Sequence, residues 1–144
     1  RVPTIATWPK RIKPGSKSDH PSTFYDYFAT VSDIISESLP YAIDGISYYP
    51  TLVGENQEKH EYLYWEFPAY GGQQAIRIDK WKGIKRDLFK GSADLQLFDL
   101  SKDPKELNNV AVNHPDLVDK LETLLKEAHT KATIQRFNIP VLDQ

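Results

Sequence analysis

Histidines are the side chains in this sequence best suited to proton transfer or metal binding near neutral pH. The four of them, His20, His60, His114 and His129, are scattered along the chain without the short spacings typical of zinc ligands. Cysteine is absent, which excludes disulfides, thiolate metal sites and a cysteine nucleophile. Nucleophile elbows and phosphate-binding glycine loops are absent as well. From the residues alone, we predict neither a metal site nor a catalytic centre in this chain.

A second candidate group of polar and aromatic side chains lies on predicted strands. Glu66 and Arg77 fall on strands expected to be adjacent, and Tyr62, Tyr64 and Tyr70 lie close to them in sequence. Aromatic rings beside a few polar groups suit a sugar or another polyol. The simpler interpretation is a cross-strand ion pair that contributes about 0–1 kcal/mol, with the tyrosines at a domain contact. The residues leave both interpretations open.

The segment that must position these side chains is residues 60–86, whose alternating pattern predicts three strands. Two short turns join them, the first at Gly71-Gly72, because glycine tolerates positive φ. Such short connections are typical of antiparallel neighbours. The alternating residues 95–100 predict a fourth strand. We therefore expect a small antiparallel sheet with one buried face and one polar face.

The clearest helix is predicted to begin near Pro115, because proline suits the first helical turn. Its apolar side chains recur at three- and four-residue spacing. The stripe comprises Leu117, Leu121, Leu124, Leu125 and Ala128. Such a stripe needs a partner, and the apolar face of the predicted sheet is the natural one.

Two further elements are predicted nearer the N-terminus. Residues 2–8 form a short apolar run that suits a buried strand. Ser22 or Thr23 can cap a helix that ends at Pro40. The apolar stripe of this helix, expected to lie in the core, comprises Phe24, Tyr27, Phe28, Val31, Ile34, Ile35 and Leu39.

Overall composition is that of a soluble globular protein. A net charge of −2 gives no electrostatic argument for nucleic acid or for anionic membranes. The sequence contains neither an apolar run near the ~20 residues that span a bilayer nor an N-terminal signal pattern. Methionine is absent and the chain opens with RVPTIATWP, which favours a fragment or excised domain; an engineered product after tag removal is the alternative.

Five segments match, in order, motifs that occur together in one enzyme family. Residues 1–15 resemble R-V-P-x-I-x-x-W-P-x-x-I-x-P-G, and residues 44–54 resemble D-G-x-S-x-x-P-x-L-x-G. Asp26 and Thr30 match a segment in which an Asp precedes Pro-Thr and an apolar helix, although Ala29 replaces the proline. The predicted sheet itself is the fourth match. The fifth resembles L-Y-D-L-x-x-D-P-x-E-x-x-N-x-A, through Leu97, Asp99, Leu100, Asp103, Pro104, Glu106 and Asn109, with Phe98 replacing tyrosine.

Together these motifs resemble the C-terminal part of type I sulfatases, the formylglycine-dependent arylsulfatase family of the alkaline phosphatase superfamily. The resemblance implies an α+β fold, in which a four-stranded antiparallel sheet packs on a long C-terminal helix. A strand and a helix left over from a larger α/β domain would precede it. On this basis residues 1–54 are the end of the large sulfatase domain, and residues 55–144 are the C-terminal subdomain.

The resemblance also implies a parent enzyme that hydrolyses sulfuric esters with calcium and formylglycine. The family nucleophile lies in a C/S-x-P-x-R motif; the nearest match, at Ser38-Leu39-Pro40, lacks the arginine. We therefore expect the catalytic groups upstream, this chain alone to be inactive, and its partner to be the N-terminal catalytic domain of the same parent chain. The parent would bind a sulfated small molecule or sugar. It would be periplasmic or secreted if it is a typical bacterial sulfatase.

Within this chain the expected role is substrate recognition. His60, at the start of the first strand, is the first candidate, with His20, Glu66, Gln73 and Arg77 behind it; a buried or capping histidine is the alternative. An independent carbohydrate-binding or structural module is the alternative function. If a larger body is missing, an apolar patch around Ile5, Trp8, Phe24 and Phe28 should be exposed. The substrate, and sulfate rather than phosphate or phosphonate chemistry, are left open.

Overall fold

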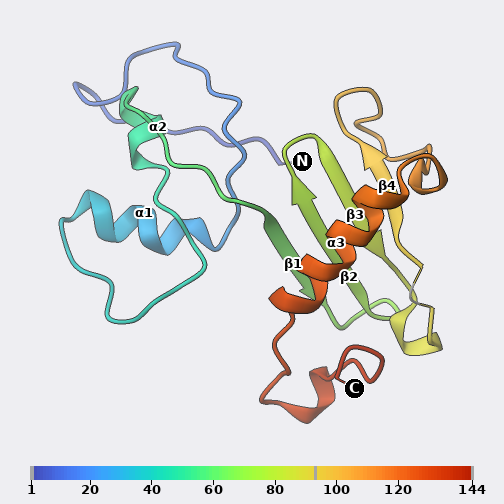
Figure 1. Ribbon diagram of the computed structural model, residues 1–144. Coiled ribbons are helices and arrows are strands. Elements are labelled where there is room, and N and C mark those ends of the chain that lie inside the picture. The colour runs from blue at the N-terminus through green and yellow to red at the C-terminus, as the bar shows by residue number, and fades with distance from the viewer. Residues whose placement is uncertain (1, 93, 144) are drawn as a thin grey trace. The chain divides into compact units, whose positions relative to one another are not determined.

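The computed structural model describes residues 2–92 and 94–143 and contains two compact units, Arg1–His60 and Glu61–Gln144 (Figure 1). Each unit has its own elements and is described by itself. The predicted domain boundary after residue 54 remains a prediction, because a division by contacts does not say which residues belong to a larger domain. Within the described residues, no helix is both long enough and apolar enough to cross a bilayer.

The Glu61–Gln144 unit is built on a four-stranded antiparallel sheet. Its strands follow one another in space as in sequence: β1 (Leu63–Phe67), β2 (Gln73–Ile78), β3 (Trp81–Lys85) and β4 (Gln96–Asp99). Gly71 and Gly72 have φ of +85° and +77°, the left-handed conformation that favours glycine in the first turn. The predicted strands and their antiparallel order are confirmed.

One long helix, α3 (Pro115–Ala128), packs on one face of this sheet (Figure 1). Leu121 and Leu125 are 0% and 1% exposed and lie in a core cluster with Ile76, Leu95 and Leu97. A Cβ on Gly83 would lie 3.2 Å from Leu121 Cδ1, so the glycine lets the helix approach closely. The predicted α+β arrangement of sheet and C-terminal helix is confirmed. Short 3₁₀ turns complete the unit: η1 (Leu88–Lys90), η2 (Ala111–Asn113) and η3 (Gln135–Phe137).

The Arg1–His60 unit contains two short helices, α1 (Asp26–Ile34) and α2 (Tyr49–Val53). The strand predicted over residues 2–8 is wrong, because no described strand pairs with this segment. Val2 and Ile5 are instead 87% and 93% exposed. A strand needs a neighbour for its backbone hydrogen bonds, and an apolar run alone does not supply one.

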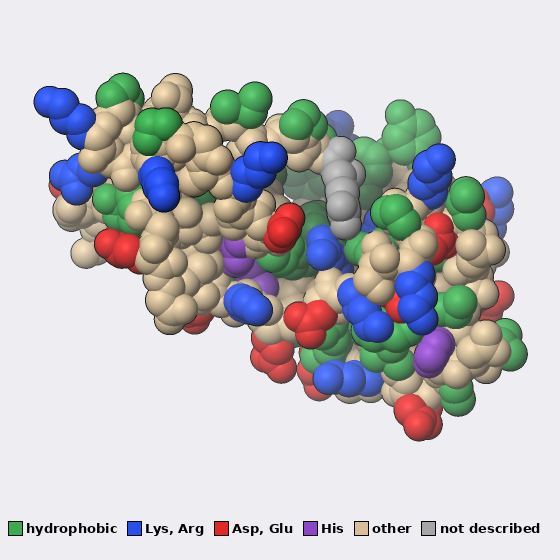
Figure 2. Space-filling model, turned by 90° about the horizontal axis from the view of Figure 1, so that it is seen from above, with side chains coloured by type: hydrophobic (Ala, Val, Ile, Leu, Met, Phe, Trp, Pro, Cys, Tyr) green, Lys and Arg blue, Asp and Glu red, His purple; other side chains and the backbone are tan. Residues whose placement is uncertain are grey.

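The apolar stripe of α1 does not lie in a core, contrary to the prediction. Phe24 is 93% exposed, and Tyr27 and Phe28 are also exposed. Exposed hydrophobic side chains are visible as green atoms in Figure 2. The opposite side of the helix is buried instead, through small and polar residues: Asp26, Ala29, Thr30 and Ser32. The apolar side of this helix is therefore largely exposed, although Val31 and Ile34 are half-buried.

Candidate functional site

His60 is hydrogen-bonded to the buried carboxylate of Asp26 at the start of α1. Its Nε2 lies 2.8 Å from Asp26 Oδ1, and the two side chains are 9% and 1% exposed. The ring of Tyr25 meets the imidazole edge-on, with centroids 5.8 Å apart. A polar pair so deeply buried needs hydrogen-bond partners for its remaining atoms.

Backbone amides supply those partners to Asp26. The N–H of Thr23 donates to Oδ2 at 2.7 Å, and the N–H of Ile46 donates to Oδ1 at 3.0 Å. The Ile46 bond requires the chain at Gly45 to pass very close to α1, because a Cβ there would lie 2.3 Å from the Tyr25 carbonyl oxygen. A negative charge is also favoured at a helix N-terminus. The Asp26 carboxylate thus accepts hydrogen bonds from two separate backbone segments in addition to its contact with His60.

His20 lies within the electrostatic reach of the same group. Burial lowers the pKa of His20 below its usual value of 6.5; the charge of Asp26 opposes that change, while His60 and Lys59 add to it. His20 and His60 therefore lie in the same unit and near enough for their charges to interact. The hydrogen bond to Asp26 is made by His60.

Glu66 belongs to a different site, on the face of the sheet that α3 covers. Its Oε2 accepts a hydrogen bond from Tyr64 Oη at 2.5 Å and lies 2.8 Å from His129 Nδ1. The other ring nitrogen of His129 lies 3.2 Å from Asp143 Oδ1. Burial lowers the pKa of His129, but hydrogen bonds and charges of Glu66 and Asp143 outweigh it and raise the pKa overall.

The predicted Glu66–Arg77 pair does not form, because the two side chains lie on opposite faces. Glu66 stands opposite Gln74 and Arg77 opposite Leu63 in the β1–β2 ladder, and alternation separates their faces. Arg77 Nε donates to the Asp79 carbonyl oxygen at 2.8 Å. Tyr62 and Tyr64 are partly buried against the core under α3, whereas Tyr70 is 85% exposed, so the three tyrosines do not share one exposed surface.

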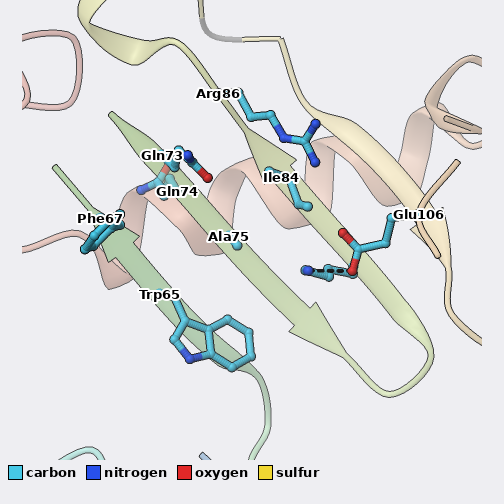
Figure 3. Close-up of a pocket in the computed structure, with 9 residues that line it drawn as sticks. Trp65, Phe67, Gln73, Gln74, Ala75, Ile84, Arg86 and Glu106 are labelled. Atoms are coloured by element: carbon cyan, nitrogen blue, oxygen red, sulfur yellow. Dashed lines mark hydrogen bonds and ion pairs between the residues drawn. The ribbon is translucent and has the colours of Figure 1, made fainter. Parts of the chain in front are cut away.

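Gln73 lies on the other face of the sheet, beside a shallow hollow of about 240 Å³. Figure 3 shows this face with α3 behind the strands. Trp65 and Phe67 are 38% and 52% exposed there, and Arg86 makes no ion pair or hydrogen bond with a described residue. The volume is below that of ordinary ligand pockets, so the hollow suits part of a sugar at most. Trp65, Phe67 and Arg86 were not among the predicted site residues, although strand alternation had already placed Trp65 and Phe67 on one face.

Metal ligands for the implied calcium are not assembled in this part of the protein. Among residues 2–92 and 94–143, no three or more His, Asp or Glu side chains are placed to hold a metal ion. The carboxylate-rich donor set that calcium prefers therefore does not fit the described residues. Ser38 lies exposed in the loop after α1 and not in the first turn of a described helix, the position that favours anion binding.

The sequence matches the family model described as N-sulphoglucosamine sulphohydrolase, C-terminal, over residues 1–132. The chain belongs to this family. The resemblance to the C-terminal part of sulfatases of the alkaline phosphatase superfamily is confirmed.

Relatives and solved structures agree with this assignment. The chain is 32% identical to an N-acetylgalactosamine-6-O-sulfatase of Bacteroides thetaiotaomicron, covering 91% of this chain and 28% of the relative. It is 30% identical to arylsulfatase K of Homo sapiens, covering 95% and 28%. A solved structure from work on glycosaminoglycan metabolism by Bacteroides thetaiotaomicron superimposes with a TM-score of 0.63 at 29% identity, covering 83% and 27%. The chain thus spans under a third of the length of these proteins.

Proposed function

We propose that the protein to which this chain belongs is a sulfuric ester hydrolase acting on a sulfated sugar, and that the chain supplies substrate recognition and a docking surface. The observation that carries this proposal is the family match over residues 1–132, in a chain that spans 28% of its curated sulfatase relatives. Formylglycine and calcium would come from the N-terminal catalytic domain of the same parent chain. The chain alone would not turn over substrate.

Docking is supported by the unburied apolar side chains of the Arg1–His60 unit. Ile5, Phe24 and Phe28 are exposed, as expected for a contact with a larger body, and Ile35 is 60% exposed. Trp8 differs, because it is half-buried, with Tyr49 6.3 Å away and the Arg11 guanidinium over its ring. A helix with its apolar face in water is stabilised by covering that face. We assign the missing cover to the N-terminal catalytic domain.

Recognition is assigned first to His60, supported by His20. Imidazole nitrogens can donate or accept hydrogen bonds with the hydroxyls of a sugar. The hollow by Gln73 is the second place for a sugar, because Trp65 and Phe67 offer exposed rings and Arg86 a cation. A larger hollow beside α1 is a poorer candidate for an anionic ligand, because Asp33, Glu37 and Glu58 line it.

Kinetics of the full-length protein test the proposal. The protein, expressed from its complete coding sequence, should hydrolyse a nitrophenyl sulfate faster than the corresponding phosphate or phosphonate ester. The 144-residue chain should show no turnover. His60→Ala in the full-length protein should raise KM for a 6-sulfated hexosamine by up to about tenfold, the range expected for one hydrogen bond. Preference for the phosphate or phosphonate ester would overturn the assignment.

A further inference from the structure

The Asp26 carboxylate leaves only one hydrogen-bonding role open to the His60 ring. Both backbone groups that reach Asp26, from Thr23 and Ile46, are N–H donors. An ionised carboxylate only accepts hydrogen bonds. His60 Nε2, 2.8 Å from Oδ1, must therefore carry the hydrogen of that contact.

The other ring nitrogen is left as the lone-pair atom in the neutral form of the ring. Nδ1 of His60 has no hydrogen-bond partner among the described residues. It is also not one of the buried side-chain atoms that lack a partner, so it keeps access to solvent. The small exposed part of this side chain therefore includes an acceptor available to a ligand.

We propose that Asp26 is the positioning residue for His60: it fixes the ring as the Nε2–H tautomer and so presents Nδ1 as a hydrogen-bond acceptor. A sulfate oxygen has no hydrogen to donate, whereas a sugar hydroxyl or amide N–H has one. Neutral His60 thus recognises the hydroxyl or amide groups of the sugar and not its sulfate. This inference rests on the proposed function, because it takes His60 as a substrate contact.

A purely structural role for Asp26 is the competing explanation. Its side chain accepts a hydrogen bond from the Thr23 N–H just before α1 and joins the helix to the segment at Ile46 whatever His60 does. Thr30 makes a similar link without touching the histidine: its Oγ1 donates to the Asp26 carbonyl oxygen and accepts from the Tyr48 N–H. Thr30→Val is therefore a matched control that weakens the same junction and leaves the carboxylate in place.

Nitrogen NMR of the histidine rings tests the tautomer. The 144-residue chain, labelled with ¹⁵N at histidine, would be recorded over a pH titration, and His20→Asn, His114→Gln and His129→Gln would assign the His60 signals. We expect Nε2 to be protonated and Nδ1 unprotonated at the alkaline end, in the wild type and in Thr30→Val. Asp26→Ala should populate the Nδ1–H tautomer, because no side-chain oxygen then accepts a hydrogen bond from Nε2. A wild-type ring protonated at Nδ1 overturns the inference without any variant, and so does an unchanged tautomer in folded Asp26→Ala.

Inhibition kinetics of the full-length protein separate this inference from the proposed function. His60→Ala should raise KM for the 6-sulfated hexosamine by up to about tenfold and leave the inhibition constant of inorganic sulfate unchanged. A parallel rise in the sulfate constant would show that His60 binds sulfate and would overturn the inference. If neither constant changes, His60 is not a substrate contact: the proposed role of this residue then fails, while the NMR result on Asp26 stands.

Discussion

His60 and His129 each lie 2.8 Å from a carboxylate oxygen, yet the two pairs have different surroundings. In the Arg1–His60 unit, one carboxylate holds one nitrogen of His60, and the other nitrogen has no hydrogen-bond partner among residues 2–92 and 94–143. In the Glu61–Gln144 unit, Glu66 and Asp143 take both nitrogens of His129. A ring with both nitrogens occupied has no atom left for a ligand. A buried histidine is therefore a candidate for ligand binding when its second ring nitrogen is available, and a carboxylate contact alone does not make it one.

The two pairs also differ in what they hold together. His129 follows α3 directly, and Asp143 lies in the last described residues, so their contact ties the C-terminal segment to β1 through Glu66. Gln74 extends this network, because its Nε2 donates to Tyr64 Oη at 2.9 Å and to the Leu125 carbonyl oxygen at 3.2 Å. We interpret this network as structural and call it the clasp: it holds the C-terminal segment against β1. Its members are His129, Glu66, Asp143, Tyr64 and Gln74.

Leu121→Ala should have the largest effect, and only on the unit with the clasp. Leu121 is 0% exposed between α3 and the sheet, so its truncation should cost about 2–5 kcal/mol. Hydrogen exchange should show faster opening of β2 and β3, with α1 and the ring signals of His60 unchanged. Leu107→Ala is the matched control, because Leu107 is 75% exposed and should cost at most about 0.5 kcal/mol. Equal effects of the two variants would contradict the packing described.

His129→Gln should break the clasp in a pH-dependent manner. Because the folded pKa of His129 is raised, its protonation stabilises the fold fully below the unfolded pKa of about 6.5, and the contribution is lost as pH rises through the folded value. We expect the variant to lose about 1.5–3 kcal/mol near pH 5.5, typical of hydrogen bonds to charged groups, and less near pH 8.5. Urea unfolding at both pH values measures this.

The control for the clasp is His114→Gln. His114 contacts the ring of Trp81, with centroids 4.8 Å apart, and no carboxylate contact is described for it. Its replacement removes this ring contact and no described carboxylate contact, which makes it the control for loss of a histidine in the same unit. The clasp is refuted if the His129→Gln deficit is as large near pH 8.5 as near pH 5.5.

Gly45→Ala should weaken the Asp26–His60 pair, the histidine–carboxylate contact of the Arg1–His60 unit. The added Cβ meets the Tyr25 carbonyl oxygen at 2.3 Å, so the segment must move away from α1 and weaken the Ile46 bond to Asp26. Forced backbone shifts of this kind cost about 1–3 kcal/mol. Hydrogen exchange at the Ile46 amide should accelerate, while amides of β2 and β3 keep their protection. An unaffected Ile46 amide would show that the close approach does not matter.

The smallest effect is expected from His20→Asn, and it has the opposite sign to that of His129. Because burial lowers the folded pKa of His20, its protonation opposes folding, and stability is lost as pH falls from the unfolded pKa of about 6.5 through the folded value. The variant should therefore lose less stability than the wild type on acidification from about pH 8 to about pH 5. Thermal unfolding of α1, followed by NMR at both pH values, measures the difference. A greater acid sensitivity of the variant would contradict the direction of the pKa change.

Periodicity alone predicted much of the Glu61–Gln144 unit. The alternating segments became β1 to β4, the Gly71-Gly72 turn formed, and the helix predicted near Pro115 begins at that residue. Local side-chain patterns determine these features, because each element buries one face against its neighbour within the same unit. The prediction that the apolar stripe of α1 lies in the core was wrong, because no described element covers that face.

The sequence by itself determined the strands, the C-terminal helix, the family motifs and the histidines worth considering. Only the tertiary structure decided that Glu66 faces α3 while Arg77 faces the other side, and that His60 meets Asp26 across 34 positions of sequence. The physical reason is that alternation assigns faces within a strand but does not set the register between strands. Contacts between distant residues likewise depend on how backbones approach, as at Gly45, which no local pattern records.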